Sequence, residues 1–152
     1  MKYISFHVPG LPATQGSKRF LGKGRVVDSC RRLPEWRSAV AYTAKQAYSG
    51  DPLSGAVTLC IAFVLPRPKS HYRTGKNAHL LRDAAPVHHV TTPDLTKMTR
   101  AVEDALKGIV WRDDSQVVEQ ETTKGYCKIC NNCHCQHVGA WVTIVDAERD
   151  AT

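Results

Sequence analysis

Residues 91–118 read TTPDLTKMTRAVEDALKGIVWRDDSQVV and combine a regular helical pattern with three aspartates. Within residues 93–106, apolar side chains recur every three or four positions, as on a helix with one buried face. That face carries Leu95, Met98, Val102, Ala105 and Leu106. The stretch therefore predicts an amphipathic helix that starts at Asp94, a turn at Asp113 and Asp114, and then a strand.

The flanking segments predict further elements around this helix. Alternating or β-branched runs predict strands at 3–10, 115–126 and 139–148 and a buried central strand at 55–68, and Gly22 and Gly24 suit the turn of an exposed ribbon formed by residues 17–21 and 25–29. Pro34 suits the first turn of a helix over 34–48. Residues 69–89 have no period and predict a long loop. We expect one α/β (α+β) domain over residues 1–152, with a small mixed sheet flanked by two helices.

The composition favours a polyanionic partner. The chain has 152 residues, and its 21 lysines and arginines exceed its 14 acidic residues, giving a formal charge of +7. Such a field attracts nucleic acid. No apolar run reaches the ~20 residues needed to cross a bilayer, and MKYISFHVPG lacks the layout of a secretion signal. We expect a location in the cytoplasm.

Asp94, Asp113 and Asp114 are candidate ligands for a hard divalent cation, because Mg²⁺ prefers oxygen donors. They can meet only if the exit turn folds back across the start of the helix. Lys97 and Arg100 would then be in reach of a phosphate at the metal. The alternative is structural: Asp94 caps the helix, and Asp113 and Asp114 form a solvated turn.

The pair of segments PDLTKMTRAVEDAL and WRDDSQVVE matches a known pattern. It resembles P-D-[IL]-D-[NK]-L-x-[KR]-A-x-x-D-A-L followed by D-D-x-Q-V, the motifs of the RusA family of Holliday junction resolvases. These are small dimeric Mg²⁺-dependent endonucleases common in phages and prophages, so the resemblance implies the cytoplasm of a bacterial or phage-infected cell. The ribbon GSKRF and the segment WRSAV match more loosely, so the resemblance covers residues 1–124 and the last strand.

By position, the resemblance implies that Asp94 is the first metal-binding aspartate and Asp114 the late one, with Asp113 beside it and Mg²⁺ or Mn²⁺ as cofactor. Arg100 stands where the family has a catalytic basic residue, often lysine. Thr96 replaces the second aspartate of D-x-D, so a carboxylate is lost. Glu103 is not an obvious substitute, because it lies roughly 10 Å further along the helix. We expect either a leaner site of the three aspartates or an altered activity.

The resemblance also implies paired nicks across a twofold axis in DNA recombination and repair, which requires a homodimer. DNA contacts are expected through backbone phosphates. The candidates are Lys18, Arg19, Lys23, Arg25, Arg31, Arg67, Lys69, Arg73, Lys76 and Lys97. A second hypothesis is a non-catalytic protein that binds branched DNA and has lost turnover through Thr96.

Residues 125–138 hold a cysteine-rich knuckle, CKICNNCHCQH, expected as the expanded tip of a hairpin between the last two strands. Cys127 and Cys130 have the C-x₂-C spacing of a zinc half-site, followed closely by Cys133 and Cys135. We expect a structural Zn²⁺, with His137 or His134 as possible substitutes for a thiol. An iron–sulfur cluster or unligated cysteines are the alternatives.

Aromatic and histidine residues elsewhere are interpreted structurally. Trp111 and Trp141 suit a core or a dimer interface, and His7 suits a structural role in the first strand. His88 and His89 precede Asp94 and suggest a proton relay. The alternative is that they have no catalytic role, because exposed histidines are common in loops.

Overall fold

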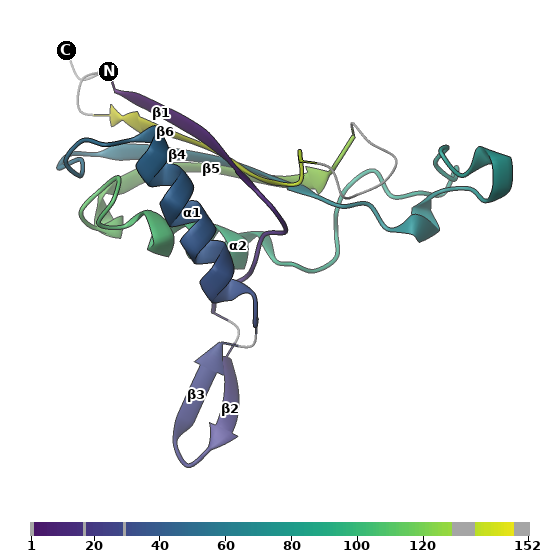
Figure 1. The fold of residues 1–152 in the computed structure, drawn as a ribbon, viewed down its shortest axis with the longest axis horizontal. Helices are drawn as coiled ribbons and strands as arrows, with labels where there is room; N and C mark the ends of the chain where they lie inside the picture. Colours follow the sequence, from purple (N-terminus) through teal and green to yellow (C-terminus); the bar gives the residue numbers. More distant parts are fainter. Residues whose placement is uncertain (1, 17, 29, 129–135, 148–152) are drawn as a thin grey trace.

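The structure is a computed structural model that describes residues 2–16, 18–28, 30–128 and 136–147. Its centre is a four-stranded sheet in the order β1-β6-β4-β5 (Figure 1). The strands are β1 (Tyr3–Pro9), β4 (Val57–Leu65), β5 (Val117–Tyr126) and β6 (Gly139–Asp146). Two helices, α1 (Leu33–Ala47) and α2 (Leu95–Leu106), pack on one face of this sheet. The expected mixed sheet with two helices is confirmed.

The connectivity differs from the expected hairpin of the last two strands. β4 pairs in parallel with β5 and antiparallel with β6, so β4 separates the two strands that flank the knuckle. The hairpin-tip prediction is therefore wrong. The crossover through α2 brings β5 parallel to β4, and β6 fills the gap between β4 and β1, where both of its edges are paired.

Alternating burial distinguishes the two faces of the sheet. In β4 every second residue from Val57 to Leu65 is at most 2% exposed and packs under the helices. The opposite face carries Thr58, Cys60 and Ala62 with their neighbours on β1, β5 and β6, and they are intermediate or exposed. A sheet covered on one side only gives this pattern.

Helix α2 confirms the amphipathic pattern. Met98, Val102 and Leu106 are fully buried, while Thr96, Arg100 and Lys107 are exposed on the other side. After the helix, Val110 and Trp111 are also fully buried. The connection to β5 is therefore tied into the core immediately after the helix ends.

Two segments project from this body (Figure 1). The first is the ribbon, β2 (Lys18–Gly22) and β3 (Arg25–Asp28), whose turn uses positive φ angles at Gly22, Lys23 and Gly24. The second is the arm, residues 66–90, which folds back on itself through two short 3₁₀ turns, Lys69–His71 and Gly75–Asn77, and a bridge between Tyr72 and Leu81. No helix in the described part of the chain is long and apolar enough to cross a membrane.

Candidate active site

Asp94 occupies the N-cap position of α2 but makes no side-chain capping hydrogen bond there. Its carboxylate instead pairs with Lys97 at 3.3 Å, one turn along the helix. Both side chains are partly exposed, so this ion pair contributes little to stability. Asp94 therefore occupies the capping position that the structural alternative expects, but it does not make the capping hydrogen bond.

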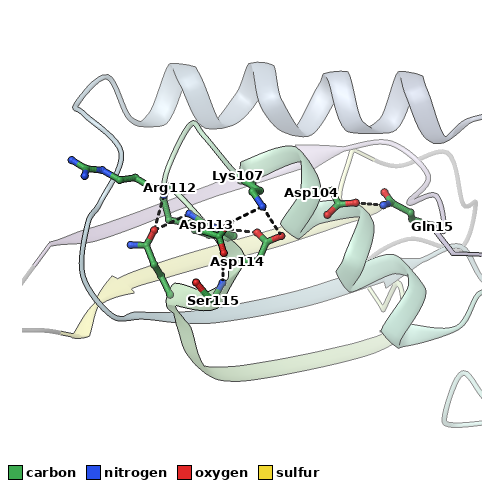
Figure 2. Close-up of polar contacts among 9 residues, drawn as sticks. Gln15, Asp104, Lys107, Arg112, Asp113, Asp114 and Ser115 are labelled. Atoms are coloured by element: carbon green, nitrogen blue, oxygen red, sulfur yellow. Dashed lines mark hydrogen bonds and ion pairs between the residues drawn. The ribbon is translucent and has the colours of Figure 1, made fainter.

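Asp113 and Asp114 lie in the turn before β5, where Figure 2 shows both carboxylates near Lys107. The Lys107 ammonium is 2.8 Å from Asp113 Oδ2 and 4.0 Å from Asp114 Oδ2. Asp113 also accepts from the Ser115 amide and forms a capping box with Gln116. Lys107 and the Ser115 hydrogen bonds hold the pKa of Asp113 well below its usual range. Asp113 therefore has a structural role in this turn.

Asp114 is held differently, through a core residue. The indole Nε1 of Trp111, which is fully buried, donates to Asp114 Oδ1 at 3.0 Å. This bond satisfies a buried donor and fixes the orientation of the carboxylate toward α2. Asp114 is the better placed of the two aspartates for a role beyond the turn.

The expected meeting of Asp94 with Asp113 and Asp114 is not formed. The first aspartate is at the start of α2 and the other two contact Lys107 just after its end, and a 12-residue helix is about 18 Å long. Among the described residues, no three His, Cys, Asp or Glu side chains are grouped so as to hold a metal ion.

Glu103 is influenced by the charges of two other acidic residues, and we call Glu103, Asp104 and Asp114 the α2 acidic group. Burial raises the pKa of Glu103, and the charges of Asp114 and Asp104 raise it further, against the hydrogen bond from Gln120. The distance along the helix from Thr96 argues against Glu103 as a substitute for the missing carboxylate. The signal that could have identified it is the seven-residue spacing, which puts Thr96 and Glu103 on the same side of α2.

The segment before the ribbon packs along α2 and holds part of this group in place. The Gln15 amide Nε2 donates to Asp104 Oδ2 (Figure 2), and the Gln15 backbone N–H donates to the Lys97 carbonyl at 3.0 Å. Arg100 lies over Gly16, with its Nη1 2.8 Å from the position that a Cβ there would occupy. A side chain at residue 16 would displace the guanidinium that occupies the family's basic position.

A surface hollow of about 660 Å³ opens beside Asp104, between the ribbon and the first turns of α1. Arg31 and Arg37 line it together with apolar residues such as Leu33. Two guanidinium groups suit a bound phosphate, because arginine donates in a planar fork. Arg37 was not among the expected DNA contacts, although it belongs to the WRSAV segment.

The remaining basic candidates divide by location. Lys18, Arg19, Lys23 and Arg25 are on the ribbon, and Lys69, Arg73 and Lys76 are on the exposed arm. Arg67 is only 9% exposed. Its guanidinium stacks 4.1 Å from the Tyr126 ring centroid and donates to the Pro86 carbonyl, so it anchors the arm to the sheet.

Of the knuckle, Cys127 is buried, and it lines a hollow of about 390 Å³ with His137 and Trp141. Cys130, Cys133, His134 and Cys135 lie outside the described residues.

The other aromatic and histidine residues have the following environments. Trp111 is in the core, as one of the expected alternatives states, and Trp141 is 48% exposed on the open face. His7 stacks on Trp141 with ring centroids 4.2 Å apart. His89 packs against Tyr126, and burial and then Lys124 lower its pKa. These contacts give His7 and His89 packing roles.

Comparison with known proteins gives the same family as the motifs. The model of the family described as Endodeoxyribonuclease RusA matches residues 9–131. The chain belongs to the RusA family. It is also 30% identical over 128 residues to "Uncharacterized protein YqaN" of Bacillus subtilis (strain 168), a match that covers 83% of this chain and 89% of YqaN. The RusA match includes both motifs, the ribbon, both helices and the strands β4 and β5.

The raised pKa of Glu103 leads to a prediction about this RusA-family protein. Because its folded-state pKa lies above the ordinary value of 4.5, folding favours the protonated carboxyl, and stability should fall as the pH rises from 4.5 through the folded-state value. Glu103→Gln removes this pH-dependent loss of stability, and its amide oxygen can still accept the hydrogen bond from Gln120. Urea unfolding should show the variant to be more stable than the wild type at pH 7 and equal to it near pH 4. A variant less stable at pH 7 would mean that the ionised Glu103 is favourably paired.

Proposed function

We propose that this protein is a Mg²⁺-dependent endonuclease that resolves four-way DNA junctions by paired nicks in recombination and repair. The observation that carries the proposal is the RusA match over residues 9–131, which spans the acidic residues of α2 and its exit turn. The formal charge of +7 favours a DNA partner, and the mutual repulsion of neighbouring carboxylates favours a bound cation.

In this proposal Asp114 is the late metal-binding aspartate, and Glu103 supplies the carboxylate that Thr96 does not. Asp94 matches the family's first aspartate by position but lies at the other end of α2, too far away to bind the same ion in this arrangement. The donors are all oxygens, which fits Mg²⁺ or Mn²⁺, and the Lys107 ammonium already occupies a cation's position beside Asp113 and Asp114. The bound metal would activate water and stabilise charge on the phosphate.

The remaining charged groups would position the DNA strand. Arg31 and Arg37 face the hollow beside Asp104, where they can hold a phosphate next to the carboxylates. Arg100, at the family's basic position, can add positive charge from the middle of α2. Gln15 fixes the direction of the Asp104 carboxylate through its hydrogen bond.

Resolution by paired nicks needs two active sites, and we propose that the open sheet face forms the homodimer interface. Tyr3 is 66% exposed and Trp141 48% exposed on this face, and Trp141 is preorganised by its stack on His7. Large exposed aromatic side chains on one face indicate an interface. Sedimentation equilibrium should give a dimer for the wild type and a monomer for Trp141→Arg.

We also propose a structural Zn²⁺ in the knuckle. Cys127 and His137, at the two ends of this segment, line one hollow, and the C-x₂-C spacing supports a half-site. Elemental analysis with less than about one zinc per chain would reject this.

The second candidate function is a branched-DNA-binding protein without turnover, favoured by the missing carboxylate at Thr96. One experiment separates the two: purified protein is incubated with a labelled four-way junction in Mg²⁺, Mn²⁺, Ca²⁺ or EDTA. Symmetric nicks in Mg²⁺ support the nuclease, and Thr96→Asp should then increase the metal affinity. Binding without nicks in Mg²⁺ and Mn²⁺ supports the non-catalytic alternative.

A further inference from the structure

The ribbon projects from the body of the protein (Figure 1). β2 and β3 pair only with each other among the described strands, and a lone two-stranded hairpin is marginally stable in water. All residues of β2 except Gly22 are exposed. A hairpin that faces only water would favour a purely polar surface. The exposed surface of this ribbon also carries apolar side chains.

Its apolar residues are arranged as a pair across the two strands. Phe20 is directly opposite Val26, so both side chains are on the same face of the ribbon. Phe20 is 68% exposed and Val26 56% exposed. The ribbon thus presents one aromatic ring, flanked by a branched aliphatic side chain, to the surroundings.

The charge around this pair is mainly positive. Residues 18–28 read KRFLGKGRVVD, with four basic residues and one acidic residue, Asp28, at the end of β3. A second copy of the same ribbon would meet it with like charge, which disfavours contact between ribbons. A polyanion fits the charge, and a polyanion with exposed aromatic faces fits the apolar pair as well.

We propose that Phe20, supported by Val26, stacks on base faces exposed at the branch point of a DNA junction while the ribbon's basic residues hold the flanking phosphates. The inference rests on the proposed function and extends it, because it assigns recognition of branched structure to a particular side chain. Paired bases in a continuous duplex are stacked and offer no free face, whereas an open branch point does. Phe20 would therefore supply selectivity and the basic residues would supply affinity for any DNA.

The test compares Phe20→Ala with Tyr42→Ala, a matched control because Tyr42 is also 68% exposed but lies on α1. Affinity is measured in Ca²⁺ for a four-way junction and for a linear duplex of the same length. Phe20→Ala should weaken junction binding by about 5- to 150-fold, the range of one lost base stack, and leave duplex binding unchanged. Phe20→Trp should restore it. A 2-aminopurine at the branch point should be quenched by the wild type and not by Phe20→Ala.

Salt dependence separates stacking from charge. Lys23→Ala should lower the slope of log affinity against log salt on duplex DNA by about 0.9, whereas Phe20→Ala should leave the slope unchanged. Far-ultraviolet circular dichroism and urea unfolding check that the variants are folded.

The outcomes of these experiments decide the matter. Junction binding unaffected by Phe20→Ala, or weakened equally on both DNAs, overturns the inference, and so does conversion of a dimer to monomers by this variant. A wild type that binds junctions through Phe20 but never nicks them removes the proposed nuclease activity and leaves the inference standing. Loss confined to junctions, with rescue by tryptophan, supports it.

Discussion

Asp114→Asn is expected to lower Mg²⁺-dependent cleavage of a four-way junction by at least about 100-fold, the scale of losing a preorganised charge at a reacting phosphate. The substitution removes the charge and little else. The asparagine Oδ1 can still accept from Trp111 Nε1, so the buried indole keeps its partner and the turn keeps its shape. Cleavage is followed on denaturing gels, and junction affinity in Ca²⁺ should stay near the wild-type value.

The adjacent aspartate offers the matched control. Asp113 is engaged with Lys107 and the Ser115 amide, and asparagine is also a good capping residue, so Asp113→Asn should cleave much faster than Asp114→Asn. Equal losses in the two variants would contradict the assignment of Asp114 as the metal-binding aspartate. Asp94→Asn, measured in the same assay, tests whether the other end of α2 takes part.

Local patterns in the sequence predicted both helices, the ribbon and the buried strand β4, because periodicity, glycine turns and β-branched runs act within a few residues. The order of the strands depends on contacts between distant segments. β5 and β6 follow each other in the chain, and consecutive strands usually pair, which favoured the hairpin. The structure instead pairs β6 with β1 and β4.

The same distinction explains the site. The sequence locates Asp94 and Asp114 correctly at the two ends of α2, but spacing does not say where the connecting segment leads. Val110 and Trp111 enter the core directly after the helix, which keeps the turn near its C-terminal end and beside Glu103. Arg67 shows a further limit of prediction from local sequence. Its charge makes it a candidate DNA contact, but its guanidinium stacks on Tyr126. This partner is 59 positions away in the sequence (126 − 67 = 59), so no local pattern indicates the contact.

Trp111→Ala is expected to cost about 3–5 kcal/mol of unfolding free energy, because a fully buried tryptophan leaves a large cavity. That is a substantial share of the about 5–15 kcal/mol by which a domain is normally stable. Urea unfolding measures the loss, and Tyr42→Ala, at an exposed position, should change stability by no more than about 0.5 kcal/mol.

Trp111→Phe separates packing from positioning at the same residue. It keeps an aromatic ring in the core but removes the Nε1 donor to Asp114, so stability should fall less than in Trp111→Ala while cleavage still falls. If Trp111→Phe cleaves junctions like the wild type, the hydrogen bond does not position Asp114. In that case Trp111 acts through packing alone, and the orientation of the carboxylate must come from Lys107 and the turn.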